Sequence, residues 1–180
     1  NMIIDVGGGS TDVAVIALGG IVVNNSIRVA GDDCDEAITK FIRKKHNMMI
    51  GERSAENLKI KVGCVYPPDT ERYESVKGRN LLTGLPMTVE ISTSDMLEAL
   101  EDPIHEIIES VHGVLEKTPP ELAADIGNKG IVMTGGGALL EGMDKLISER
   151  TGIEVKIADN PIECVAIGTG KSLEWLKSIE

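Results

Sequence analysis

The sequence has 180 residues, of which 42% are hydrophobic and 26% are charged, a globular composition that suits one large or two small domains. Its 18 Lys and Arg against 29 Asp and Glu give a net charge of −11, which disfavours nucleic acid and anionic lipid as partners. Aromatic residues make up only 2%, so a stacking surface for single-stranded bases is excluded as well.

The first thirty residues predict a small β-meander. An apolar strand over residues 3–6 leads into a glycine turn over 7–12, and the apolar run 13–18 follows it. Gly19 and Gly20 predict a second turn, and a third strand is expected over 21–29.

Helical spacing begins at Gly31, behind an acidic first turn. A second helix is expected to start at the N-cap Ser54 and to stop at Gly63. Two strands then follow, over 73–79 and 87–91, separated by a Thr-Gly-Leu-Pro turn.

The remainder alternates helices and strands. A long helical stretch is expected near Asp95, restarted at Pro103 with Asp102 as its cap. A short helix over 122–126 and a buried strand over 130–133 come next. The segment 134–140 is expected to open a helix that reaches Arg150, before a strand over 154–157 and a last helix over 163–176. This order predicts an α/β fold, in which residues near 31–94 are an insertion with its own small sheet.

The cysteines predict a reducing compartment, the cytoplasm. Cys34, Cys64 and Cys164 are far apart and form no Cys-x-x-Cys pair, so neither a disulfide framework nor a zinc site is expected. No apolar run approaches the ~18 to 20 residues that cross a bilayer. The first residues carry no charged-then-apolar leader, so no signal peptide is expected, and the start of the sequence predicts a piece of a longer chain.

The glycine run over residues 7–9 calls for a backbone reason, either a positive φ or close approach of a ligand to main-chain N–H groups. With Ser10 and Thr11 it could form an anion-binding nest, and a plain hairpin turn is the alternative. Asp5 ends the preceding strand and could hold a hydrated Mg²⁺ or cap the turn. The segment matches neither a Walker P-loop nor the dinucleotide fingerprint.

A second glycine run, over residues 135–137, lies between a predicted strand and a helix start, where unpaired N–H groups attract phosphate or ribose oxygens. Tight packing of the turn is the alternative. Two such runs in one chain indicate a nucleotide held from two sides. Glu56 and Lys59 project from one helix face and are either a solvated ion pair or the lining of an adenosine pocket.

These motifs resemble a known superfamily. Residues 5–12 are similar to the second phosphate motif of the actin, Hsp70 and sugar-kinase superfamily, and residues 134–140 to its adenosine motif. Residues 27–32, 50–56 and 83–86 resemble the MreB/Mbl family of bacterial actin-like, rod-shape-determining proteins. The resemblance covers essentially the whole chain.

The resemblance implies the C-terminal half of an actin-like ATPase fold. A ribonuclease-H-like subdomain, actin-like IIA, is expected over 1–30 and 95–180, and a smaller inserted α+β subdomain, IIB, over 31–94. Asp5 would hold Mg²⁺ through water, and Thr11 and Asp12 would support catalysis. The main catalytic carboxylate is expected in the N-terminal half of the family's proteins. The residues implied to bind ATP are Gly7, Gly8, Gly9, Ser10, Glu56, Asn57, Lys59, Gly135, Gly136, Gly137, Ala138 and Leu139.

The function implied is that of a filament subunit that organises cell-wall synthesis and determines cell shape, cytoplasmic at the inner face of the membrane. Its partners would be its own copies and membrane-associated shape and wall-synthesis proteins. No nucleic acid and no direct membrane contact by this half are expected. The parent protein would hydrolyse ATP, and this half alone little or none. An Hsp70-type or small-molecule-kinase ATPase is the alternative.

Overall fold

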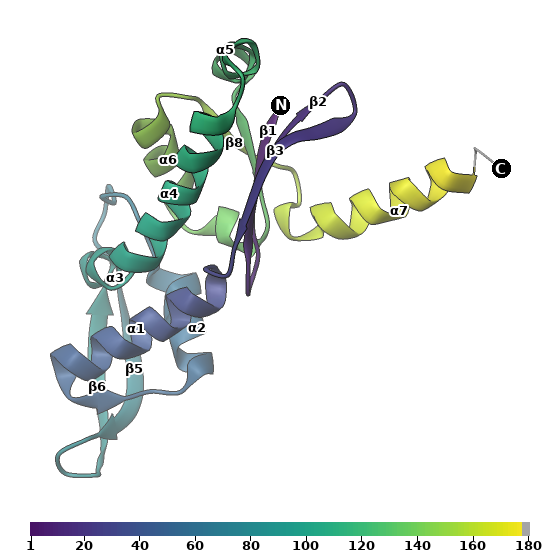
Figure 1. Ribbon diagram of the computed structural model, residues 1–180. Coiled ribbons are helices and arrows are strands. Elements are labelled where there is room, and N and C mark those ends of the chain that lie inside the picture. Colours follow the sequence, from purple (N-terminus) through teal and green to yellow (C-terminus); the bar gives the residue numbers. More distant parts are fainter. Residues whose placement is uncertain (178–180) are drawn as a thin grey trace.

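The structure, a computed structural model, describes residues 1–177 and contains two separate β-sheets flanked by helices (Figure 1). The larger sheet has the strand order β3-β2-β1-β7-β8. β1, β2 and β3 pair antiparallel, whereas β7 and β8 run parallel to β1. The predicted α/β class and meander are confirmed. The strands of this sheet are β1 (Met2–Val6), β2 (Thr11–Ala17), β3 (Gly20–Ile27), β7 (Ile131–Thr134) and β8 (Val155–Ile157).

Alternation of apolar side chains explains how this sheet forms. Met2, Ile4 and Val6 of β1 are buried, and Val13 and Val15 of the neighbouring β2 are buried beside them. α4 packs on β2 and β3, and α6 packs on β8, so the helices bury the apolar side chains of the sheet. The helices of this part are α4 (Glu101–Lys117), α5 (Pro120–Lys129) and α6 (Met143–Thr151).

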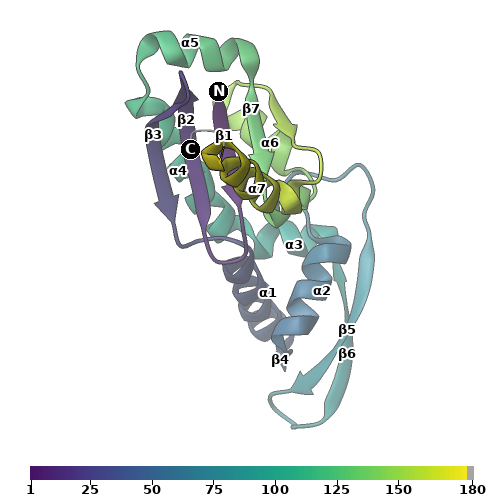
Figure 2. The ribbon, with the colours of Figure 1, turned by 90° about the vertical axis from the view of Figure 1, so that its right-hand side faces the viewer.

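The second sheet has the order β4-β5-β6 and lies beside α1 and α2 (Figure 2). α1 buries Cys34, Ile38 and Ile42 and ends at Asn47, which has a left-handed φ of 48°. The short strand β4 was not predicted, because two residues give no periodicity. The elements of this part are α1 (Gly31–His46), β4 (Met48–Met49), α2 (Glu52–Val62), β5 (Tyr73–Asn80), β6 (Pro86–Ser92) and α3 (Thr93–Ala99).

Two predicted helix caps were wrong. α2 starts earlier than expected, with Gly51 as its N-cap, and the amide of Ser54 donates to the Gly51 carbonyl within the first turn. The long helix is two helices that break at Leu100, which caps α3 and starts α4. Asp102 is therefore not the cap, and Pro103 lies in the first turn of α4, where its missing N–H leaves no hydrogen bond unmade.

The predicted helix over 134–150 is also interrupted. A short 3₁₀ helix, η1 (Gly136–Leu139), follows β7, and α6 begins only after Gly142, whose φ is +83°. Between them the carbonyl of Glu141 accepts a 2.9 Å hydrogen bond from the amide of Val65. This contact holds the chain extended where a continuous helix was expected.

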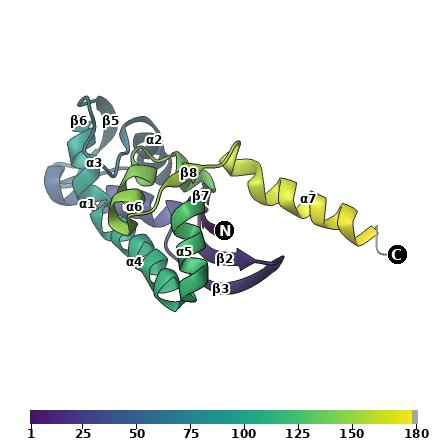
Figure 3. The same cartoon turned by 90° about the horizontal axis from the view of Figure 1, so that it is seen from above.

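The last helix, α7 (Cys164–Lys177), extends away from the rest of the molecule (Figure 3). At its start it contacts η2 (Pro161–Glu163). Val165, Ile167 and Leu173 are consequently exposed apolar residues.

One continuous hydrophobic core runs through both sheets. The expected boundaries at 30/31 and 94/95 separate the two sheets along the chain, but they stay a prediction. Among residues 1–177, no helix combines the length and the apolar character that crossing a bilayer requires.

Candidate functional site

The two glycine runs meet at the carboxyl ends of two neighbouring strands. Asp5 of β1 pairs in register with Thr134 of β7, although the two are 129 positions apart. The Thr134 hydroxyl donates a 2.9 Å hydrogen bond to Oδ1 of Asp5. Because β1 and β7 are parallel, the loops that follow them leave the sheet at the same edge, which is where α/β proteins bind ligands.

Tight packing explains two glycines of the second run. A Cβ atom at Gly135 would lie 2.2 Å from the Val6 carbonyl oxygen, and φ there is +83°. A Cβ at Gly137 would lie 2.3 Å from Cγ1 of Val6. A Cβ at Gly136, in contrast, would meet nothing within 4 Å. Gly136 is therefore the member of this run that faces open space, and its neighbours seat η1 on the end of β1.

The first run forms the hairpin turn between β1 and β2. The Gly7 amide donates to the Ser10 carbonyl at 2.9 Å, and none of residues 7–9 has a positive φ. The backbone of residues 7–10 is thus the plain hairpin turn given as the alternative. The prediction that these glycines adopt a positive φ was wrong. The carbonyls of Gly7 and Gly8 accept from the amides of Gly31 and Asp32 at 3.1 and 2.8 Å, which fixes the turn against the start of α1.

Several main-chain donors of the two runs remain available. The amides of Gly8, Gly9 and Ser10 have no protein acceptor among the hydrogen bonds of residues 1–177. Gly136 and Gly137 open a 3₁₀ helix, so their amides have no acceptor within it. These donors at one edge of the sheet could bind the oxygens of an anion.

The supporting residues occupy different environments. The Thr11 side chain is fully buried, and its hydroxyl donates a 2.7 Å hydrogen bond to the Val29 carbonyl. Asp12 is exposed and accepts from the Ser10 hydroxyl at 3.2 Å. Their predicted catalytic support stays a prediction, and the bond made by Thr11 ties β2 to the segment before α1.

Lys59 does not pair with Glu56, so the ion-pair alternative was wrong. Its Nζ lies 2.9 Å from Oδ2 of Asp35 and 2.8 Å from the Gly31 carbonyl oxygen. Burial raises the pKa of the Asp35 carboxyl, and the hydrogen bond and charge of Lys59 oppose that rise. Lys59 therefore holds α2 against the first turn of α1, next to the Gly7 turn. Glu56 and Asn57 are exposed on α2.

Asp32 is a site residue that the sequence analysis missed. Its carboxylate oxygens lie 3.6 and 3.9 Å from the positions that Cβ atoms at Gly8 and Gly9 would occupy. The sequence indicates only an acidic first turn of α1 and a family-like stretch over 27–32, and assigns Asp32 no role in the site. Its position directly after Gly31 carried no signal that the turn over 7–10 packs on this helix end.

The donors at this edge fit a hydrated Mg²⁺. Magnesium keeps several waters and takes one or two carboxylates together with phosphate oxygens. Asp5 supplies a carboxylate beside Gly135, and Asp32 supplies one beside Gly8 and Gly9. Within residues 1–177 no group of three or more His, Cys, Asp or Glu side chains could hold a metal by itself, so a dedicated protein cage is not formed there.

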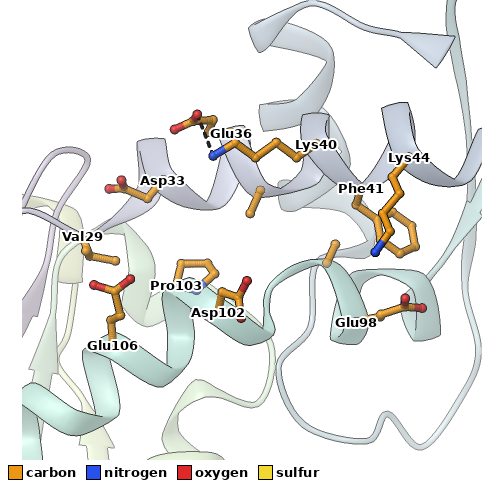
Figure 4. Close-up of a pocket in the computed structure, with 12 residues that line it drawn as sticks. Val29, Asp33, Glu36, Lys40, Phe41, Lys44, Glu98, Asp102, Pro103 and Glu106 are labelled. Atoms are coloured by element: carbon orange, nitrogen blue, oxygen red, sulfur yellow. Dashed lines mark ion pairs between the residues drawn. The ribbon is translucent and has the colours of Figure 1, made fainter. Parts of the chain in front are cut away.

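A hollow of about 420 Å³ between α1 and the α3–α4 pair is chemically different (Figure 4). Lys40 pairs with Glu36 at its rim, at 2.8 Å. Five carboxylates and two lysines line it, and this excess of negative charge disfavours a phosphate-bearing ligand. The glycine edge, not this hollow, is the candidate nucleotide site. Its charged residues are Asp33, Glu36, Lys40, Lys44, Glu98, Asp102 and Glu106.

Comparison with known proteins gives consistent similarities. A family model described as MreB/Mbl protein matches residues 1–180. The cell shape-determining protein Mbl of Bacillus cereus is 47% identical over 174 residues, which cover 97% of this chain and 52% of that protein. The cell shape-determining protein MreB of Escherichia coli is 47% identical over 176 residues, which cover 98% of this chain and 51% of that protein.

Solved structures show the same likeness. The crystal structure of MreB5 of Spiroplasma citri bound to ADP superimposes with a TM-score of 0.95 at 40% identity, covering 98% of this chain and 54% of that one. A second MreB5 structure, bound to AMPPNP, gives the same TM-score of 0.95. The chain thus spans about half the length of the proteins it matches.

Proposed function

The chain belongs to the MreB/Mbl family and has the actin-like fold, and from this we propose that it forms one wall of the ATP site of a filament-forming ATPase. The family and the fold predicted from the motifs are confirmed. The family-model match and the likeness to the MreB5 structure favour a filament-forming actin homologue over an Hsp70-type or small-molecule-kinase ATPase. Because the chain spans about half of its relatives, the activity of the whole protein belongs to the proposal.

The observation that carries the proposal is the pairing of Asp5 with Thr134. It brings the turn over residues 7–10 and the segment over 135–139 to one edge of the sheet. The free amides of the turn would bind the β and γ phosphates, and Gly136 would let the nucleotide approach the main chain. The MreB5 structures bound to ADP and AMPPNP support nucleotide binding at such a site.

The remaining residues take positioning roles. The Asp5 carboxylate, oriented by Thr134, would hold Mg²⁺ through water, and Asp32 would face the same ion across the turn. When bound, Mg²⁺ neutralises phosphate charge during phosphoryl transfer. Glu56, Asn57 and Lys59 would flank the adenosine from α2. Thr11 and Asp12 would support the placement of the attacking water, and the main catalytic carboxylate would come from the half outside this chain.

We also propose the cellular role suggested by the relatives' names. The Mbl and MreB relatives are cell shape-determining proteins, which supports a role in cell shape for the parent protein. Assembly with its own copies, contact with wall-synthesis proteins and a place at the inner face of the membrane follow from this role. We also propose that the chain divides at 30/31 and 94/95 into a ribonuclease-H-like subdomain and a smaller inserted subdomain.

Nucleotide hydrolysis and sedimentation of the full-length protein test the proposal. We expect ATP-dependent pelleting and phosphate release, both reduced at least about tenfold in Asp5→Asn, because the substitution removes the charge that faces Mg²⁺. The 180-residue chain alone should release phosphate little or not at all. Turnover of the isolated chain equal to that of the full-length protein would contradict the proposal, as would undiminished binding of Mg-ATP by Asp5→Asn.

A further inference from the structure

Lys59 makes two bonds that a place beside the adenosine does not explain. Its Nζ lies 2.8 Å from the Gly31 carbonyl oxygen and 2.9 Å from Oδ2 of Asp35. The lysine side chain is 19% exposed and the aspartate side chain 16% exposed, so the solvent screens these bonds little. A hydrogen bond from a charged donor is roughly twice as strong as a neutral one. The Gly31 carbonyl therefore accepts a strong bond from a positive charge.

The peptide group of that carbonyl continues towards the glycine turn. The Gly31 carbonyl and the Asp32 amide belong to one peptide group, and this amide donates to the Gly8 carbonyl at 2.8 Å. The Gly8 carbonyl in turn shares a peptide group with the Gly9 amide. The described chain has no cis peptide bond, so the Gly9 N–H points away from the start of α1. We call this chain of hydrogen bonds, from the Lys59 ammonium through two peptide groups, the Lys59–Gly9 relay.

A second bond acts on the neighbouring amide. The Gly31 amide donates to the Gly7 carbonyl at 3.1 Å, and that carbonyl shares a peptide group with the Gly8 amide. A Cβ at Gly31 would lie 3.3 Å from the Gly7 carbonyl oxygen and 3.4 Å from Nζ of Lys59. The glycine thus allows the turn, the helix start and the ammonium to meet. The peptide groups of two free amides are consequently hydrogen-bonded at their carbonyl ends.

The glycine edge has no cationic side chain in its own segments. Residues 1–27 and 130–144, which contain both glycine runs, include no Lys or Arg. The Asp32 carboxylate adds negative charge beside the turn. Hydrogen bonds in a chain polarise one another, which strengthens each by about 10 to 30%. Lys59, at the start of such a chain, makes the Gly9 amide a stronger donor to an anion.

We propose that Lys59 is a positioning residue for the phosphates, which strengthens the Gly9 amide as a donor through the Lys59–Gly9 relay. The inference rests on the proposed function and deepens it, because it assigns the ammonium a role towards phosphate in addition to the place beside the adenosine. Asp35 acts in the opposite sense, since its negative charge offsets that of the ammonium.

Binding of adenosine, ADP and ATP to the full-length protein with Mg²⁺ separates this role from lining of the adenosine pocket. In Lys59→Met we expect the affinities for ADP and ATP to fall about fivefold more than that for adenosine, because only phosphate meets the Gly9 amide. Lys59→Arg keeps the charge and should recover part of the loss. Lys61→Met, which removes a 2.6 Å ion pair with Glu74 on the same helix, should leave all three affinities unchanged. Equal losses for the three ligands in Lys59→Met would overturn the inference.

Asp35→Asn separates the relay from simple packing of α2 on α1. Asparagine keeps an oxygen that can accept from Lys59 and removes the charge that offsets the ammonium. We therefore expect ATP affinity equal to or higher than that of the wild type, even though the contact between the two helices is weakened. Parallel losses of ATP affinity in Asp35→Asn and Lys59→Met would show a purely structural clamp and overturn the inference.

The Gly9 amide proton reports on the relay without any ligand. Stronger polarisation of an N–H moves its proton resonance downfield. In nucleotide-free full-length protein, Lys59→Met should thus move the Gly9 and Asp32 amide protons upfield, and Lys61→Met should not. An unchanged Gly9 resonance in Lys59→Met would overturn the inference, and ATP binding by the wild type would leave the proposed function standing. A wild type that binds no ATP would overturn the proposed function and the inference with it.

Discussion

The Thr134 hydroxyl donates a 2.9 Å hydrogen bond to Oδ1 of Asp5 and thereby links the ends of two parallel strands. Each strand continues directly into a glycine run. The bond orients the half-buried carboxylate of Asp5 beside Gly135. Loss of the donor should therefore affect ligand binding more than folding.

Thr134→Val removes this donor while keeping the shape of the side chain. We expect the free energy of unfolding to fall by about 1 kcal/mol, the typical net contribution of one hydrogen bond. We also expect the affinity for Mg-ATP to fall about fivefold to tenfold. Urea denaturation and titration with a fluorescent ATP analogue measure the two effects.

Thr118→Val is the matched control for that substitution. The Thr118 hydroxyl is buried and donates to the Val114 carbonyl at 2.7 Å, at the far end of α4. It should lose similar stability and keep its nucleotide affinity. Equal loss of affinity in both variants would show that the Thr134 effect is only structural.

The predictable part of the structure was its local periodicity. The strands and helices follow from alternating or helical spacing of apolar residues, and residues 5–12 and 134–140 carried the family motifs. Contacts between distant segments could not be predicted in this way. The Lys59–Asp35 pair and the position of Asp32 beside the Gly8 turn depend on how α2 packs on α1, which no local pattern encodes.

Gly136→Leu separates ligand approach from folding. A side chain there enters open space, so we expect the unfolding free energy to change by less than about 1 kcal/mol. The same side chain would occupy the space into which the nucleotide enters, and affinity for Mg-ATP should fall at least tenfold, which is about 1.4 kcal/mol. Gly127→Leu, at an exposed glycine of α5 with equally open surroundings, should leave binding unaltered. Full affinity in Gly136→Leu would show that the nucleotide does not approach the main chain at Gly136.

Gly137→Ala, unlike Gly136→Leu, should lower the stability of the fold. Its Cβ would lie 2.3 Å from Cγ1 of Val6, so β1 and η1 must separate. We expect destabilisation of about 1 to 3 kcal/mol, the usual cost of overpacking a core. Thermal unfolding followed by circular dichroism measures it, and a variant as stable as the wild type would mean that η1 is not seated on β1 as described.

Lys59→Met should give a pH-dependent loss of stability. Near pH 7 it leaves the partly buried Asp35 carboxylate without its partner, and we expect a cost of about 2 kcal/mol, below the ~3 to 5 of a fully buried pair. The pKa of Asp35 is already raised by burial, and without Lys59, which opposes the rise, it should increase further. A carboxyl with a raised pKa in the folded state gains stability on protonation, so the deficit should shrink as the pH falls. Urea denaturation at pH 7 and pH 5 tests this sign, and a deficit independent of pH would contradict it.

The buried thiols should be unreactive. Burial raises the pKa of Cys34 and that of Cys64 to about 11 in each case, so both remain protonated at neutral pH. Cys164 is more exposed and should be the thiol that reacts rapidly with N-ethylmaleimide. Since both folded-state pKa values are raised, the associated stability is present below about pH 9 and is lost as the pH rises towards about 11. Mass mapping of the alkylated peptides identifies the reactive thiol, and rapid labelling of Cys34 in folded protein would be the contrary result.

Hydrogen exchange of the full-length protein with and without Mg-AMPPNP tests the central claim most directly. The account predicts that the nucleotide slows exchange in two segments, residues 5–12 and 134–140, and that both are protected over the same range of nucleotide concentration. Protection of only one segment, or protection of residues 33–44 and 98–106 around the acidic hollow instead, would contradict a shared nucleotide site at the ends of β1 and β7.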